Sequence, residues 1–233
     1  MEIPKLIFFD AGGTLFEPRE SVGETYSRLA RQYEHWLDAE TLQANFLTHF
    51  RAQPPLAFPG IEGDAELQRL EYAWWRRLVF DVVAGDRFAH FDEFFAAAFA
   101  YYCQPQAWRL FDDVLPTLQA LRANKVPCAV LSNFDSRLLG LLRGFELEPY
   151  FTGVHFSTRL GSAKPERQIF TAALQAHSLK PHEAWHVGDS LREDFEGAQD
   201  AGLVPWLLDR TSTGPAKLSG QLSRLDQLVN WLQ

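Results

Sequence analysis

Five short polar segments of this chain carry side chains that could together handle a negatively charged ligand. They are Asp10, Ser132-Asn133, Lys164, Asp189 and Asp194. Three carboxylates brought together repel one another and call for a divalent cation, and hard oxygen ligands favour Mg²⁺. A lysine ammonium and a serine hydroxyl add a positive charge and a hydrogen-bond donor for an anionic group. These residue types are suited to phosphoryl transfer through an aspartyl-phosphate.

Each segment alone also has an ordinary structural interpretation. An Asp before Gly12-Gly13 is typical of a turn, Ser132-Asn133 is typical of a helix cap, and Lys164-Pro165 is typical of a solvated lysine at a helix start. The functional interpretation depends on all five segments together, because several of them come at or soon after the end of an apolar run. In an open parallel sheet, ligands bind at the carboxyl ends of the strands.

The elements that must position these residues alternate between strands and helices. Buried strands are expected at 6–9, 126–131, 154–156, 184–187 and 204–208, and a helix is expected to run to Leu232 at the end of the chain. Such alternation predicts an α/β fold, a Rossmann-like parallel sheet with right-handed crossovers. His186 lies within one of these strands and is expected to be a core residue.

The chain between the first and second expected strands has a different pattern of hydrophobic residues. Residues 17–104 show helical spacing without a strand pattern, which predicts an all-helical cap domain inserted into an α/β core of residues 1–16 and 105–233. The spacing of the cap's aromatic residues predicts that they pack in its interior rather than line a pocket. They are Trp36, Trp74, Trp75, Phe91, Phe94, Phe95 and Phe99.

Composition excludes several classes of protein. The chain has 233 residues with a net charge of −8, which is unfavourable for binding nucleic acid. Its apolar runs are far shorter than a membrane span, and its start does not resemble a signal peptide. Two cysteines are too few for a disulfide framework. We therefore expect a cytoplasmic protein that acts on a small anionic substrate without nucleic-acid or membrane partners; its oligomeric state stays open.

Four motifs resemble those of the haloacid dehalogenase superfamily of hydrolases. They are Phe8-Phe9-Asp10-Ala11-Gly12-Gly13-Thr14-Leu15, Val130-Leu131-Ser132-Asn133, Ala163-Lys164-Pro165, and Val187-Gly188-Asp189-Ser190 with Asp194. The resemblance implies that Asp10 is the nucleophile, that Thr14 orients its loop, and that Ser132, Asn133 and Lys164 hold the substrate. It also implies that Asp10, the Gly12 carbonyl, Asp189 and Asp194 serve Mg²⁺.

One departure from the family pattern concerns the second position after the nucleophile. Phosphatases of the family carry an aspartate there, as general acid and base, whereas this chain has Gly12. Loss of general acid–base help costs about 10²–10⁴ in rate. The resemblance therefore predicts a phosphatase of low activity, similar to the Reg-2-like group, whose Ser-Asn-Phe-Asp phrase recurs at 132–135.

The same residues leave three alternatives to this prediction. The family's 2-haloacid dehalogenases also lack that aspartate, but they place a small neutral residue where this chain has Asp189. Its phosphonoacetaldehyde hydrolases need a cap lysine, and no lysine lies between Leu6 and Asn124. A binding or regulatory protein that kept the fold but lost turnover is a third alternative. None of the cap side chains is diagnostic of one particular substrate.

Overall fold

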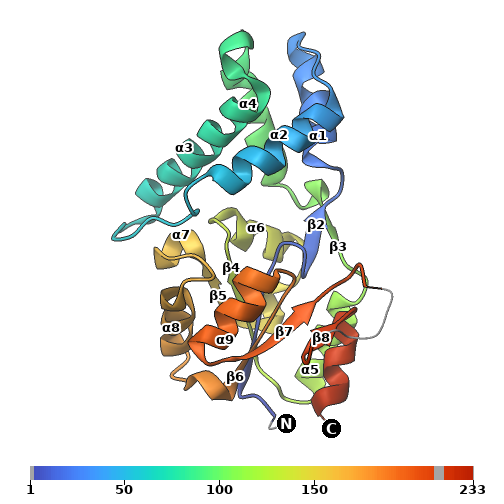
Figure 1. Cartoon of the computed structure of the whole chain (residues 1–233), viewed down its shortest axis with the longest axis vertical. Coiled ribbons are helices and arrows are strands. Elements are labelled where there is room, and N and C mark those ends of the chain that lie inside the picture. The colour runs from blue at the N-terminus through green and yellow to red at the C-terminus, as the bar shows by residue number, and fades with distance from the viewer. Residues whose placement is uncertain (1–2, 213–217, 233) are drawn as a thin grey trace. The chain divides into compact units, whose positions relative to one another are not determined.

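A six-stranded parallel sheet with the order β5-β4-β1-β6-β7-β8 forms the centre of the α/β unit (Figure 1). Its strands are β1 (Leu6–Phe9), β4 (Cys128–Ser132), β5 (Phe151–Phe156), β6 (Ala184–Gly188), β7 (Val204–Leu208) and β8 (Gln221–Leu222). The strand order reverses direction at β1, which lies between β4 and β6. This topology confirms the expected Rossmann-like α/β fold and puts the polar residues that follow these strands at one edge.

The structure is a computed structural model that describes residues 3–212 and 218–232. The chain divides into two units, one of Met1–Glu17, Ala57–Ile61 and Leu110–Gln233, the other of Pro18–Leu56 and Glu62–Arg109. The expected boundaries at 16/17 and 104/105 lie near two of these divisions, while the segment Ala57–Ile61 groups with the α/β unit. No helix in the described ranges is long and apolar enough to cross a membrane.

Helices cover the sheet of the α/β unit (Figure 1). They are α5 (Val114–Ala123), α6 (Arg137–Gly144), α7 (Ser157–Leu160), α8 (Arg167–Ala176), the π-helix η6 (Leu191–Glu196) and α9 (Gly197–Ala201), with the 3₁₀ helices η4 (Glu148–Tyr150), η5 (Pro181–Glu183) and η7 (Leu225–Leu232). Because side chains alternate along a strand, Leu6 and Phe8 share one face. There they form a core with Ile169 and Ala173 of α8 and Ala198 of α9.

Two segments differ from the sequence-based expectation. The helix expected from Leu191 begins as a π-helix, because the Phe195 amide donates to the Ser190 carbonyl five residues back at 3.1 Å. The end of the chain forms β8 and a 3₁₀ helix instead of one long α-helix. The Leu207 amide donates to the Gly220 carbonyl and the Asp209 amide to the Leu222 carbonyl, which holds the end of the chain in the sheet.

The second unit is helical. It contains α1 (Val22–Ala30), η1 (Arg31–Tyr33), α2 (Ala39–Ala52), α3 (Asp64–Val83), η2 (Gly85–Arg87), α4 (Phe91–Tyr102) and η3 (Pro105–Ala107). Where the chain passes between the units, β2 (Phe16–Pro18) pairs with β3 (Trp108–Leu110). The helical spacing of residues 17–104 does not predict β2, which enters that range at its start, and β3 lies outside the range.

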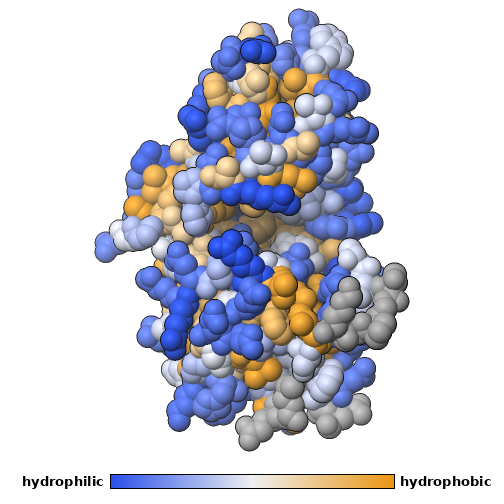
Figure 2. Space-filling model, in the orientation of Figure 1, coloured by the Kyte–Doolittle hydropathy of each residue, from blue (hydrophilic) through white to orange (hydrophobic). Residues whose placement is uncertain are grey.

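The aromatic residues of the helical unit are mostly packed. Phe91, Phe94 and Phe95 are buried, and Trp74, Trp75 and Phe99 are half-buried. The expectation of interior packing is wrong for Trp36, which is 74% exposed because it lies in the loop between η1 and α2. In the view of Figure 2, hydrophobic and hydrophilic residues alternate over the surface in small groups.

Candidate active site

The carboxyl end of β1 delivers Asp10 into a tightly hydrogen-bonded loop. The Asp10 amide donates to the Val187 carbonyl of the neighbouring strand at 2.8 Å. The Ala11 carbonyl then accepts hydrogen bonds from the Leu15 and Phe16 amides at 2.8 and 3.2 Å. Because one carbonyl accepts hydrogen bonds from two successive amides, the loop folds back on itself. The Asp10 side chain is thereby held at the sheet edge and is buried, with 6% of the residue exposed.

Lys164 is the buried cation of the site. Its Nζ lies 2.6 Å from Asp10 Oδ1 and also contacts Asp194 Oδ1. Burial disfavours the ammonium, but the adjacent charges of Asp10 and Asp194 outweigh it and raise the pKa of Lys164. Lys164 therefore stays protonated and compensates part of the negative charge around it.

The Asn133 side chain fixes the backbone of Lys164. Its Oδ1 accepts from the Lys164 amide at 2.7 Å, and its Nδ2 donates to the Lys164 carbonyl at 2.9 Å and to Glu193 Oε2 at 3.1 Å. The sequence motif predicts that Asn133 binds substrate, and in this structure its amide group joins the loop after β4 to the backbone of Lys164. Hydrogen bonds to both the amide and the carbonyl of Lys164 fix the position of its backbone, from which the side chain extends.

Ser132 is the last residue of β4 and is 2% exposed. Burial raises the pKa of Asp10, while the Lys164 ammonium and a hydrogen bond from the Ser132 side chain counteract that rise. The serine hydroxyl and the lysine ammonium thus converge on the Asp10 carboxylate, which the sequence motif predicts to be the nucleophile. Both are donors that an anionic group bound there could also use.

Asp194 is held by more protein donors than the sequence suggests. Its Oδ2 accepts from the Ser190 amide at 3.0 Å, and its Oδ1 lies 2.8 Å from His186 Nε2 as well as near Lys164. Although burial opposes it, the Lys164 charge followed by the His186 hydrogen bond lowers the pKa of Asp194. The carboxylate is therefore ionised and fixed in orientation.

His186 is the site residue that sequence reasoning missed. It was expected in the core and is indeed fully buried on β6, but its ring contacts Asp194. Burial lowers the pKa of His186, so the ring is neutral near pH 7 and the Nε2 proton is assigned from the carboxylate contact. The available signal was an imidazole in an otherwise apolar strand three residues before Asp189.

Asp189 follows β6 and is the exposed carboxylate of the site. Its carboxyl group lies so close to Gly13 that a Cβ there would collide with it, and Gly13 has a φ of +79°. Desolvation, followed by repulsion from Asp10 and Asp194, raises the pKa of Asp189 to about 7. The close approach explains why glycine is needed at position 13.

The donor set fits a divalent cation. Asp10, Asp189 and Asp194 each offer a carboxylate oxygen, and these oxygens all lie within 4.8 Å of one another. Desolvation is the main cause of the raised pKa of Asp189 and repulsion from Asp10 and Asp194 adds to it, so a cation bound there would favour the ionised carboxylate. The acidic cluster is thus suited to a hard metal ion with oxygen ligands.

Gly12 and Thr14 lie in the Asp10 loop. A Cβ placed on Gly12 would meet no other atom within 4 Å, so the structure has room for a side chain there. Thr14 is fully buried and its amide donates to the Ala11 carbonyl at 3.3 Å, while its hydroxyl has no hydrogen-bond partner among the described residues. Thr14 therefore contacts the loop through its backbone.

Comparison with known proteins identifies the family to which the sequence is similar. The family model "haloacid dehalogenase-like hydrolase" matches residues 4–202. The chain is 29% identical over 232 residues to haloacid dehalogenase-like hydrolase domain-containing protein 3 of Danio rerio, covering 97% of this chain and 91% of the relative. It is 28% identical over 209 residues to the rhythmically expressed gene 2 protein of Drosophila melanogaster, covering 85% and 80% of the two chains.

Two solved structures share the fold. A phosphatase of this superfamily from Thermococcus onnurineus has a TM-score of 0.67 at 21% identity, covering 100% of this chain and 98% of its own. A 2-haloacid dehalogenase from Pseudomonas syringae has a TM-score of 0.69 at 23% identity, covering 99% and 98%. Because the family model spans most of the sequence and the two relatives align over 91% and 80% of their length, this chain belongs to the haloacid dehalogenase-like hydrolases, in a branch similar to the rhythmically expressed gene 2 protein.

Proposed function

We propose that the chain hydrolyses a small phosphorylated metabolite by Mg²⁺-dependent phosphoryl transfer to Asp10. The observation that carries this proposal is the convergence of the Asp10, Asp189 and Asp194 oxygens within 4.8 Å. A hydrolase that attacks carbon and releases halide has no use for three clustered carboxylates, whereas phosphoryl transfer needs a cation to neutralise the phosphoryl oxygens.

The residues of the chain have distinct roles in this reaction. An Asp10 oxygen attacks phosphorus and the bond between phosphorus and the leaving oxygen breaks, which gives an aspartyl-phosphate and an alkoxide or alcohol. Lys164 and Ser132 donate hydrogen bonds to the transferred group. Water then attacks phosphorus and the bond between phosphorus and the Asp10 oxygen breaks, which releases inorganic phosphate and regenerates the Asp10 carboxylate. When bound, Mg²⁺ would be held by Asp10, Asp189 and Asp194 with the Gly12 carbonyl, and would supply electrostatic stabilisation.

Gly12 limits the expected rate. The leaving oxygen must gain a proton and the attacking water must lose one, and Gly12 has no side chain to exchange either. General acid–base catalysis contributes about 10²–10⁴-fold to such steps. We therefore propose a phosphatase that is slow for esters with poor leaving groups. The absence of a side chain at Gly12 also favours a second candidate function, that of a protein that binds a phosphorylated ligand without turnover.

A substrate panel distinguishes these candidates. Phosphate monoesters and 2-chloropropionate are assayed with and without Mg²⁺, using the wild type and Asp10→Asn. Phosphate release that needs both Mg²⁺ and Asp10 is the expected result. Halide release without metal would replace the proposal by dehalogenation. Beryllium fluoride bound at Asp10 with no turnover of any ester would favour the binding protein, and failure to bind Mg²⁺ would refute the phosphoryl-transfer proposal.

A further inference from the structure

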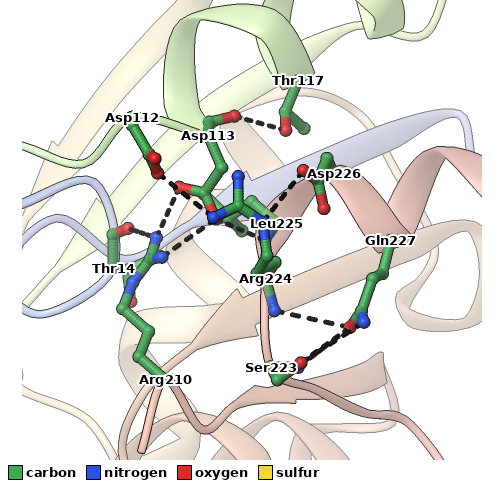
Figure 3. Close-up of polar contacts among 10 residues, drawn as sticks. All are labelled: Thr14, Asp112, Asp113, Thr117, Arg210, Ser223, Arg224, Leu225, Asp226 and Gln227. Carbon is green, nitrogen blue, oxygen red and sulfur yellow. Dashed lines mark hydrogen bonds and ion pairs between the residues drawn. The ribbon is translucent and has the colours of Figure 1, made fainter.

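A buried ion pair joins the start of α5 to the segment after β7 (Figure 3). Asp113 is 1% exposed and receives both terminal nitrogens of Arg210, at 2.9 and 3.0 Å. The Leu225 amide also donates to the Asp113 carboxylate at 2.8 Å. Asp113 therefore has three donors from two later segments of the chain, in the bidentate arrangement that a planar guanidinium favours.

The same guanidinium reaches the loop that carries Asp10. Arg210 Nη2 donates to the Thr14 carbonyl at 2.8 Å, as Figure 3 shows. The next carbonyl, that of Leu15, accepts from the Phe111 amide at 3.1 Å, and the Arg210 guanidinium lies 3.8 Å from the centre of the Phe111 ring. Two successive carbonyls of the loop are thus held by one small group of residues outside it.

Burial of the Arg210 guanidinium in this ion pair has a desolvation cost. The Arg210 side chain is only 17% exposed, and its Nε has no hydrogen-bond partner among the described residues. A buried ion pair gives little net stability relative to apolar packing, because desolvation opposes the attraction. What the guanidinium adds over an apolar side chain is a fixed donor for the Thr14 carbonyl.

We infer that Arg210 is a positioning residue that fixes the Asp10 loop through the Thr14 carbonyl, with Asp113 orienting the guanidinium. The loop folds back on the Ala11 carbonyl, so displacement of Thr14 would shift the attachment of Asp10. Lysine cannot replace arginine here, because one ammonium lacks the planar fork that reaches both Asp113 oxygens and a carbonyl. For catalysis, the inference rests on the proposed phosphoryl transfer to Asp10.

Hydrogen exchange tests the inference independently of activity. The amides of Leu15 and Phe16, which donate to the Ala11 carbonyl, are followed in the wild type, Arg210→Lys and Arg224→Gln. Arg224 is a matched control, since it is an exposed arginine of the same region that pairs with Asp112 and Asp226. We expect at least tenfold faster exchange of the loop amides in Arg210→Lys and no change in Arg224→Gln. Unchanged loop exchange with a lower Tm would overturn the inference and leave Arg210 a purely structural residue.

Kinetics and rescue provide the second measurement. A misplacement of about 1 Å can cost 10²-fold in rate, so Arg210→Lys is expected to lower kcat for an aryl phosphate by about 10–100-fold with little change in KM.

If Arg210→Lys does not fold, Arg210→Ala with added guanidinium replaces it. Partial return of slow hydrogen exchange at the Leu15 and Phe16 amides then supports the inference. A folded variant without such a return contradicts it. A wild type with no turnover, but with the expected change in loop exchange, would refute the phosphatase proposal and retain Arg210 as the residue that holds the loop.

Discussion

The ammonium of Lys164 lies 2.6 Å from the carboxylate of Asp10, and both side chains are nearly inaccessible to solvent. The same ammonium contacts Asp194, so one cation serves two buried anions. The negative charge of this cluster therefore exceeds the positive charge that the protein supplies. Lys164 links the stability of the α/β unit to the chemistry of its site.

Replacing Lys164 by methionine tests this link. The variant keeps an apolar stem of similar length but leaves Asp10 and Asp194 without their partner, and loss of one member of a buried ion pair costs roughly 3–5 kcal/mol. Urea unfolding at pH 7.5 measures the difference, with the exposed Lys180→Met as a control expected to change stability by less than about 0.5 kcal/mol. Equal stabilities of Lys164→Met and the wild type would show that the two carboxylates do not depend on Lys164.

Gly12→Asp is expected to raise the turnover of an alkyl phosphate by about 10²-fold or more, because it supplies the missing acid and base. The structure has space for it, since nothing lies within 4 Å of a Cβ at this position. The measurement is kcat with Mg²⁺ present, and Gly12→Asn is the matched control because it has the same shape without a titrating proton. A similar kcat in both variants would mean that the absence of a carboxyl group at position 12 does not limit the rate.

The residues that follow strands could be identified from sequence because their positions depend on a local pattern. An apolar run that ends in Asp10 or Asp189 indicates both the strand and the edge at which the side chain emerges. The structure brings Asp10, Lys164, Asp189 and Asp194 together at that edge. Parallel pairing of β1 with β4 and β6 makes this convergence a consequence of the fold class.

Tertiary contacts made the other features unpredictable. In the sequence, His186 has the pattern of a core residue. Its contact with Asp194 depends on the π-helix η6, which brings the Asp194 carboxylate back to the imidazole ring. Asp113 and Arg210 are separated by 97 positions, and no local spacing marks their pairing. The role of the Asn133 amide depends on where the loop of Lys164 lies, which the sequence of neither segment specifies.

The pH dependence of stability is expected to report on Asp113. Burial opposes it, but the Arg210 contact, followed by the Leu225 amide, lowers the pKa of Asp113 below its ordinary value of 3.8. A lowered folded-state pKa contributes stability that is present above the unfolded pKa and is lost as pH falls through the folded one. The difference in unfolding free energy between the wild type and Asp113→Asn should therefore be constant from pH 7 to 5 and shrink below about pH 4. If this difference in unfolding free energy stays constant down to pH 2.5, the result would contradict a lowered pKa of Asp113 in the folded state.

Metal binding is expected to stabilise the chain through Asp189. A cation that binds only the folded state raises stability by RT ln(1 + [L]/Kd), which is about 2.7 kcal/mol at a hundredfold excess over Kd. Asp189 is the exposed member of the three-carboxylate cluster, so Asp189→Asn removes one ligand without leaving a buried charge unpaired. Scanning calorimetry should show a rise in Tm with Mg²⁺ for the wild type and for the control Glu196→Gln, an exposed acid of the π-helix η6 that follows Asp189. The rise should be largely lost in Asp189→Asn. If Asp189→Asn keeps the full Mg²⁺-dependent rise, the cation binds elsewhere on the chain, because Asp189 offers one of the three carboxylate oxygens of this cluster.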